Sequence, residues 1–122
     1  MSERERRLEA LSGLGCILCR QRHRFQHGDI HHLNLGGHAG QKRRGDRFTI
    51  CLCPWHHRAV PLPGLDLKRT ETLCGPSLAR SPRLFRETWG SDDDLLYHQD
   101  ELLVQHGYTF PPKGPFARSV AD

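Results

Sequence analysis

Two short knuckles of cysteine and histidine constrain this 122-residue chain more than any other feature of its sequence. The first knuckle is Cys16-x-x-Cys19, and the second, Cys53-x-x-His56, repeats the same spacing. A turn of this length brings two ligands to one ion at tetrahedral angles, so two knuckles complete a closed four-ligand zinc site. We therefore expect a structural zinc ion at Cys16, Cys19, Cys53 and His56.

Cys51 competes with Cys53 for the third thiolate position. We favour Cys53, because the two residues between it and His56 mirror the first knuckle. Other readings of the cysteines remain: a thioredoxin-like redox pair would need a βαβ context that this pattern lacks, and the thiols could be unrelated core residues. Cys74 stands alone, and we expect it to be a free or buried thiol.

Composition favours a small domain that depends on metal. Only 36% of the residues are apolar and the mean hydropathy is -0.64, so the core is modest and a metal ion would stabilise it. Five cysteines without an apolar leader indicate metal binding rather than disulfides. No apolar run is long enough to span a membrane, and we expect a cytoplasmic protein. The formal net charge of +4 proves nothing about nucleic acid by itself.

The chain predicts one α+β domain over residues 1–122. Within it we expect a metal-binding core at 14–60, supporting loops and helices at 61–106, and an extended tail at 107–122. Patterning predicts helices, strands and a Gly-rich loop in this order: helix 2–12, strand 29–33, loop 34–46, strand 47–52, short helix 55–60, helical turn 67–73, helix 82–89 and a last helix from 92 to about 106.

Several faces of these elements can also be predicted. The Glu and Arg residues of 2–12 favour a solvated face. Alternation along 47–52 predicts a half-buried strand with Phe48, Ile50 and Leu52 on one side. In the helix that Ser81 caps, Leu84, Phe85 and Trp89 are expected to line one side.

The loop between the strands carries the densest positive charge in the chain. Its glycines allow close approach to a ligand, and cations on such a loop suit contacts with nucleic-acid phosphates. The alternative is a loop that is merely solvated. The candidate DNA-binding residues are Lys42, Arg43, Arg44 and Arg47.

Histidines left over from the zinc knuckles can form a second metal site. His31 and His32 lie in the first predicted strand, and His57 follows the zinc ligand His56. Alone, the His31-His32 pair would be read as surface histidines in a chain that has nine. The knuckles on either side favour a role in metal binding.

Taken together, these motifs resemble the HNH endonucleases, also known as His-Me finger or ββα-metal nucleases. Within that group the chain is most similar to the Ref-type recombination-enhancement nucleases of phages and bacteria, which act with a RecA filament. The resemblance covers roughly residues 14–96. It is carried by the Cys16-x-x-Cys19 knuckle, the His31-His32 strand, the segment 49–57 and the segment 75–80.

The resemblance implies a zinc-stapled ββα-metal domain that hydrolyses DNA. His31 and His57 would bind a catalytic Mg²⁺ or Mn²⁺, which Zn²⁺ can replace, and His32 would be the general base. The family commonly has His or Asn after the loop glycine, whereas Asp46 stands there in this chain. Asp46 could orient His32, bind the metal or have no role.

The resemblance also implies DNA and a RecA-type filament as partners, in a recombination or phage context. Asp46 sustains an alternative, a zinc-stabilised module that binds DNA or the filament without cutting. A third reading, a purely structural zinc protein, leaves the extra histidines unexplained.

Overall fold

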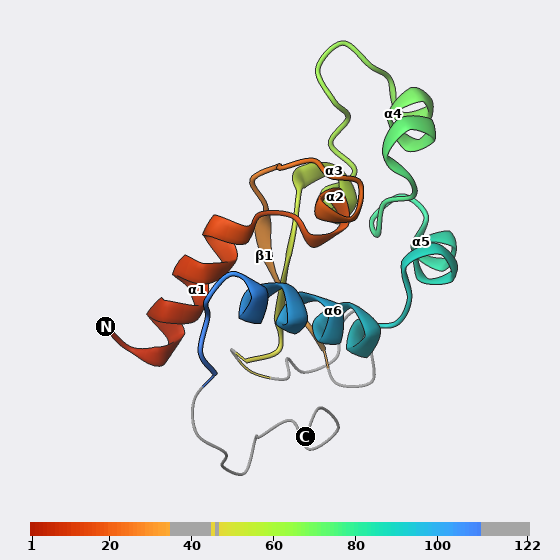
Figure 1. Cartoon of the computed structure of the whole chain (residues 1–122). Coiled ribbons are helices and arrows are strands. Elements are labelled where there is room, and N and C mark those ends of the chain that lie inside the picture. The colour runs from red at the N-terminus through yellow and green to blue at the C-terminus, as the bar shows by residue number, and fades with distance from the viewer. Residues whose placement is uncertain (35–44, 46, 111–122) are drawn as a thin grey trace.

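The computed structural model of this chain describes residues 1–34, 45 and 47–110 (Figure 1). Over these residues the fold is small and α+β, as predicted, with helices around a two-stranded sheet. In chain order the elements are α1 (Glu3–Leu14), α2 (Ile17–Gln21), β1 (Asp29–His32), β2 (Thr49–Leu52), α3 (Pro54–Arg58), α4 (Leu67–Cys74), α5 (Pro82–Trp89) and α6 (Asp92–Gln105).

Local capping signals set the starts of the longer helices. Ser2 and Glu5 form a capping box at α1, and Ser91 and Asp94 form one at α6. In each box the serine hydroxyl accepts the N–H of the third helical residue, whose carboxylate accepts the serine N–H in return. Pro82 occupies the first turn of α5, where a missing N–H costs nothing. These starts confirm the predicted helices.

The two short helices at the knuckles differ from the prediction. Residues 17–21 form α2, where we expected only a turn followed by polar chain. Helix α3 begins at Pro54 and ends at Arg58, because Ala59 adopts a left-handed conformation with φ of 59°. The helix therefore begins one residue before the predicted range 55–60 and ends two residues before its end.

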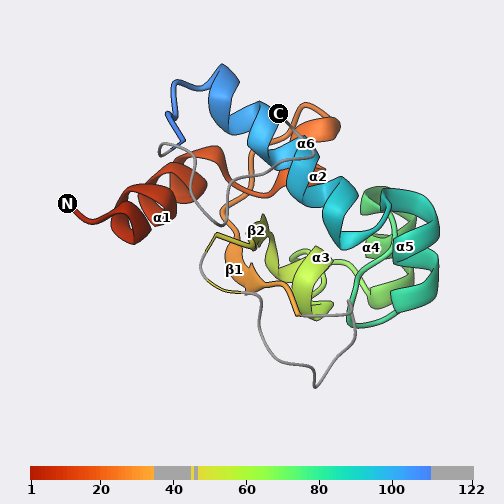
Figure 2. The same cartoon turned by 90° about the horizontal axis from the view of Figure 1, so that it is seen from below.

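Strands β1 and β2 pair antiparallel, and His31 lies opposite Ile50. All four residues of β2 are buried, so the predicted half-buried strand was wrong. The reason lies outside the strand: α1, α2 and α6 all contact β2, and α3 contacts both strands. Figure 2 shows α6 running past the sheet, with α1 at one end of the molecule and α4 and α5 at the other.

Polar side chains from α1 and α6 make hydrogen bonds with the backbone groups of β2 on the side away from β1. The Gln99 amide donates to the Thr49 carbonyl at 2.7 Å and accepts the Cys51 N–H at 2.8 Å, much as a neighbouring strand would. Arg7 donates to the same carbonyl and to the Thr49 hydroxyl. Arg7 is only 5% exposed, so the predicted solvated face of this helix was wrong at this residue.

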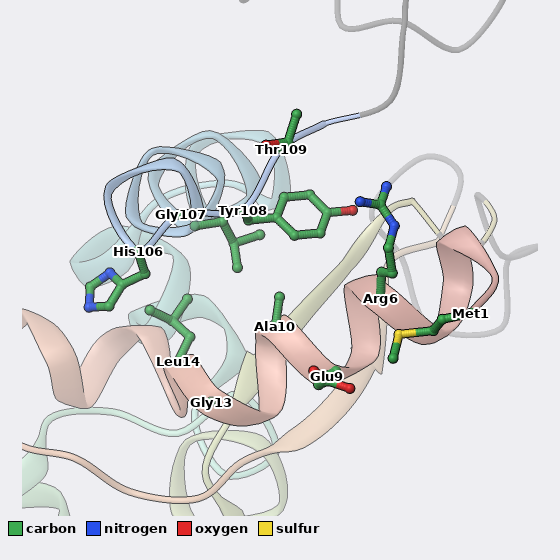
Figure 3. A pocket seen from close by; sticks show the side chains of 11 residues that line it. Met1, Arg6, Glu9, Ala10, Gly13, Leu14, His106, Gly107, Tyr108 and Thr109 are labelled. Carbon is green, nitrogen blue, oxygen red and sulfur yellow. The ribbon is translucent and has the colours of Figure 1, made fainter.

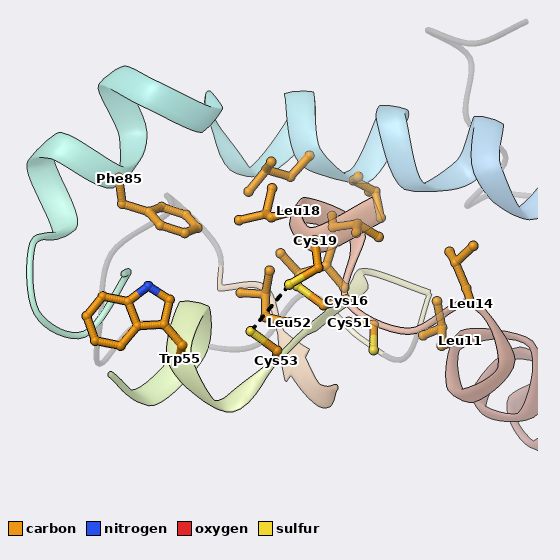
Figure 4. Close-up of a cluster of buried hydrophobic side chains, with 14 of the residues drawn as sticks. Leu11, Leu14, Cys16, Leu18, Cys19, Cys51, Leu52, Cys53, Trp55 and Phe85 are labelled. Carbon is orange, nitrogen blue, oxygen red and sulfur yellow. Dashed lines mark hydrogen bonds between the residues drawn. The ribbon is translucent and has the colours of Figure 1, made fainter. Parts of the chain in front are cut away.

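The hydrophobic core lies between α6, the two knuckle helices and β2 (Figure 4). Phe85 and Trp55 extend it toward α5, but Leu84 is 47% exposed, so that part of the predicted apolar side was wrong. None of the helices in the described ranges is both long and apolar enough to cross a membrane. The fully buried side chains include Leu11, Ile17, Leu18, Leu33, Ile50, Leu52, Trp55, Phe85, Leu95 and Leu103.

Replacing Gln99 by Met tests whether its amide closes the edge of β2. Methionine keeps a similar volume but leaves the Cys51 N–H without its acceptor. We expect a loss of about 1–3 kcal/mol in the free energy of unfolding, measured by urea denaturation in the presence of zinc. The control Gln105→Met, at the exposed end of α6, should change stability by less than about 0.5 kcal/mol. Equal stability of the two variants would contradict the edge-closing role.

Candidate metal centre and the neighbouring histidines

The side chains of Cys16, Cys19, Cys53 and His56 converge on one point, with all four ligand atoms within 4.8 Å of one another. At ordinary zinc bond lengths, a tetrahedral site separates two thiolates by about 3.8 Å, and a thiolate from an imidazole nitrogen by about 3.5 Å. The observed Cys19–Cys53 sulfur distance is 3.8 Å. The three sulfurs lie 3.2–3.8 Å from His56 Nδ1. The cluster therefore has the dimensions of a zinc site.

Each knuckle is held by the start of a helix. Cys16 is the N-cap of α2, and its N–H donates to the Gln26 carbonyl at 2.8 Å. The Cys19 carbonyl accepts N–H groups from the chain that turns back after α2. Cys53 is the N-cap of α3, where its sulfur accepts the His56 N–H at 3.4 Å. Helix geometry thus places both ligands of each knuckle on one side.

A backbone carbonyl fixes which nitrogen of His56 faces the cysteines. Nε2 lies 2.9 Å from the carbonyl oxygen of Cys74. That oxygen can only accept, so Nε2 carries the proton and Nδ1 presents its lone pair to the sulfurs. Trp89 packs edge-on against the imidazole, with ring centroids 5.6 Å apart. The orientation of this ligand therefore does not depend on a bound ion.

The segment after α4 closes the cluster from the other side. The Gly75 carbonyl accepts the indole N–H of Trp55 at 2.9 Å. The Leu78 N–H donates to the His56 carbonyl at 2.9 Å. Because Gly75 has φ of 87° and lies against the Trp89 ring, a side chain at this position would be both strained and crowded. The segment therefore shields the ligands from water.

Hydrogen bonds within the cluster act in opposite directions on its thiols, because they raise the pKa of Cys19 and lower that of Cys16. Hydrogen bonds from Cys19 and Cys53 hold the pKa of the Cys16 thiol well below its ordinary value, and the thiolate is the form that binds metal. Burial raises the pKa of Cys51 to about 12, so this thiol stays protonated. Its sulfur packs against Gly28, where a methyl group would overlap it. The cluster contains Cys53 and not Cys51, as the spacing predicted.

His31 and His57 come together beside this cluster. His31 is on β1 and His57 on α3, and their ring centroids are 4.8 Å apart. Both side chains are half-buried. Burial lowers the pKa of His31 to about 4, and the charge of His57 contributes further. His31 is therefore neutral at physiological pH, which is the form that binds a metal ion.

Two imidazoles provide only part of a coordination shell. Among the described residues, the Cys/His cluster is the group of three or more metal-type ligands that the structure gathers. A metal at His31 and His57 would thus keep open positions, unlike the closed cysteine cluster. Such open positions are where water and substrate oxygens bind in catalytic metal sites.

The remaining predicted site residues fall into three groups. His32 is the last residue of β1 and lies opposite Thr49 in the sheet. Arg47 forms an ion pair with Glu3 at 3.0 Å, so a carboxylate of α1 partly neutralises this predicted DNA-binding cation. The other predicted residues lie outside the described ranges: Lys42, Arg43, Arg44 and Asp46.

Sequence reasoning missed Asp29 and Arg58. One oxygen of Asp29 lies 3.3 Å from His57 Nδ1 and accepts the Arg58 Nε proton at 2.7 Å. Arg58 lowers the pKa of Asp29, and His57 adds to the effect. The position of Asp29, an acidic residue two positions before His31, could have indicated its role. The contact of the Cys74 carbonyl with His56 could not have been predicted, because a backbone carbonyl is the same at every residue.

A pocket of about 460 Å³ lies between α1 and the end of α6 (Figure 3). Arg6 and Tyr108 face each other across it, and His106 lies at one side. None of the residues that line it belongs to the metal cluster or to the predicted catalytic set. This pocket is therefore separate from the predicted site residues.

Comparison with known proteins gives one match. The sequence model of the family described as "recombination enhancement, RecA-dependent nuclease" matches residues 1–104. No curated protein and no solved structure matches the chain.

Removal of the metal should unfold this protein. Binding energy at a structural zinc site is folding energy, on the order of 10 kcal/mol. We expect complete chelation, or Cys16→Ser or Cys19→Ser, to abolish the cooperative thermal transition measured by circular dichroism. A cooperative transition that survives complete chelation would contradict the zinc assignment.

Cys51→Ala is the matched control for the ligand cysteines. It removes a buried sulfur that lies outside the cluster, so the variant should still bind one zinc ion per chain. Zinc content measured by atomic emission distinguishes the two cases. Loss of zinc from Cys51→Ala would mean that Cys51 and not Cys53 is the third thiolate.

Proposed function

The chain belongs to the family of recombination enhancement, RecA-dependent nucleases, and we propose that it is an HNH-type endonuclease that hydrolyses DNA with a divalent metal ion. One observation carries the proposal. His31 and His57 pair at 4.8 Å between ring centroids although neither belongs to the cysteine cluster. A purely structural zinc protein would have no use for this second pair.

The two metal sites would have separate tasks. Zn²⁺ in the closed cluster of three thiolates and His56 would hold the knuckles together. Mg²⁺ or Mn²⁺ at His31 and His57, or Zn²⁺ in their place, would stabilise negative charge on the leaving oxygen of the phosphodiester. Imidazoles on a strand and on a helix suit this task, because each is held by its own element.

His32 would act as the general base. Histidine is the side chain best suited to accept a proton at neutral pH, and this one lies next to the metal ligand His31. Consecutive strand residues point to opposite faces, but β1 ends at His32. The general-base role therefore requires the backbone to depart from ideal strand geometry at His32, so that this side chain turns toward water bound beside the phosphate.

Cations at the base of the loop would hold the DNA backbone. Arg47 precedes β2, one residue after Asp46, and Lys42, Arg43 and Arg44 are close to it in sequence. Phosphate contacts position a nuclease on DNA without reading the bases. Asp46 would orient His32 or assist the metal from a second shell.

A RecA-type filament would compensate for a low affinity of this protein for DNA. A net charge of +4 gives a chain of this size only modest electrostatic attraction to DNA. Docking on the filament would hold the histidines beside one strand and raise their effective concentration there. We therefore expect weak nicking by the protein alone and stronger, localised cutting on filament-coated DNA.

His32→Ala separates the chemistry from binding. A general base acts on water and contributes little to DNA affinity, so cleavage should fall by at least about 10²-fold while affinity stays near that of the parent. His57→Ala should reduce cleavage and raise the metal requirement together. We would measure nicking of plasmid and single-stranded DNA with Mg²⁺ or Mn²⁺, with and without the filament.

His106→Ala serves as the control, because it removes an exposed histidine at the far end of α6. Its cleavage rate should match that of the parent. If the parent and an Asp46→His variant bind DNA but cut it under no combination of metal and filament, the chain is a binding module. Parental cleavage by His32→Ala would place the base elsewhere.

Replacing Lys42, Arg43 and Arg44 together by Ala tests the loop. Each lost phosphate contact should lower the slope of log affinity against log salt by roughly one. Binding should weaken for every DNA sequence tested by fluorescence anisotropy. The control Lys68→Ala/Arg69→Ala removes two exposed cations from α4, and its slope should stay close to the parental one. An unchanged slope in the loop variant would exclude the loop from the interface.

A further inference from the structure

Asp29 joins the start of β1 to α3 through a single carboxylate oxygen. Its Oδ2 lies 3.3 Å from His57 Nδ1 and 2.7 Å from Arg58 Nε. Both partners are consecutive residues of α3, whereas Asp29 is the first residue of β1. None of these three residues is a ligand in the cysteine cluster.

This contact determines which nitrogen of His57 is available. An ionised carboxylate can only accept hydrogen bonds, so His57 Nδ1 must carry the proton. In the neutral imidazole, which is the form that binds a metal ion, Nε2 then has a free lone pair. Without a partner, a neutral imidazole in water favours the opposite tautomer, with the proton on Nε2. Asp29 therefore reverses the intrinsic preference of this side chain.

Arg58 keeps the carboxylate in place. Its guanidinium is half exposed, but its contact with Asp29 is the shorter of the two. Because it donates to the same oxygen that faces His57, Arg58 restricts rotation of the carboxylate.

The neighbouring residue His56 has the same arrangement, with the roles of its two ring nitrogens exchanged. His56 gives its Nε2 proton to the Cys74 carbonyl and directs Nδ1 at the cysteines. His57 directs Nδ1 at Asp29, which leaves Nε2 available on a ring whose centroid lies 4.8 Å from that of His31. Hydrogen-bond acceptors behind metal-binding histidines commonly act in this way, by fixing the tautomer and the ring orientation.

We propose that Asp29 is a positioning residue for His57: it fixes the Nδ1-protonated tautomer and holds the ring beside His31 so that Nε2 can bind a divalent metal. The inference rests on the proposed function in assigning His57 to the catalytic metal. It adds a residue that neither touches the metal nor reacts.

The first test reads the tautomer directly. Long-range proton–nitrogen NMR of the parent, loaded with one equivalent of zinc at neutral pH, should show His57 with the proton on Nδ1. The His57→Gln variant identifies the signals, because they alone disappear. In Asp29→Ala the proton should move mainly to Nε2. A parent with the proton on Nε2, or with both nitrogens protonated, would overturn the proposal.

The second test measures metal binding without turnover. Asp29→Ala should weaken Mn²⁺ binding at the histidine pair by about 10–100-fold. The binding is measured by the paramagnetic broadening of the His31 and His57 signals as Mn²⁺ is added. Asp29→Asn should give a smaller loss, because its uncharged oxygen still accepts a weaker hydrogen bond. Should Asp29→Ala fail to fold, this isosteric variant carries the test.

A matched control removes a carboxylate of α5 whose ion-pair partner is an arginine. Glu87→Gln breaks an exposed ion pair with Arg83 and changes the net charge equally. Its His57 tautomer and Mn²⁺ affinity should equal those of the parent. Unchanged Mn²⁺ affinity in both Asp29 variants, with intact folding, would overturn the proposal.

The two proposals fail in different ways. A parent that shows the Nδ1 tautomer and binds Mn²⁺ at the histidine pair, yet never cuts DNA, supports the role of Asp29 and overturns the nuclease. A parent that cuts DNA, with a tautomer and metal affinity that do not respond to Asp29, overturns only the positioning role.

Discussion

The convergence of three thiols and one imidazole is the constraint on which the rest of this fold depends. It joins the start of α2 to the start of α3, and the Cys74 carbonyl behind His56 adds the end of α4. Without an ion, three sulfurs and a nitrogen confined within 4.8 Å would be poorly solvated and would repel one another once deprotonated. A bound zinc ion would remove this repulsion and link segments that are distant in sequence.

The sequence predicts features that depend on neighbours along the chain. Ser2 and Glu5 predict their capping box because both partners lie within one helical turn. The spacing of Cys53 and His56 distinguishes Cys53 from Cys51 because a helix N-terminus sets the distance between them. In each case the geometry is local, and a few residue types suffice to specify it.

Contacts across the fold could not be predicted in the same way. Arg7 lies in a run of charged residues that would suit solvent, and only the position of the Thr49 carbonyl makes it a buried donor. Gln99 is equally ordinary in sequence, yet it replaces a missing strand beside β2. Asp29 acquires its partners only when the sheet and α3 meet. Such pairs depend on the tertiary arrangement, which no local pattern encodes.

His56 and His57 are adjacent on the five-residue helix α3. They link the cysteine cluster, which contains His56, to the pair of His31 and His57. Successive helical residues differ in direction by about 100°, so His56 can face the buried cysteines while His57 faces β1. Fixing His56 therefore fixes the backbone that carries His57, and the sheet register fixes His31 against it. The ligand types would also keep two metal ions apart, because thiolates select zinc whereas imidazoles with open positions accept several divalent ions. Under the proposed function, the closed site would hold the backbone rigid while the open site exchanges ligands.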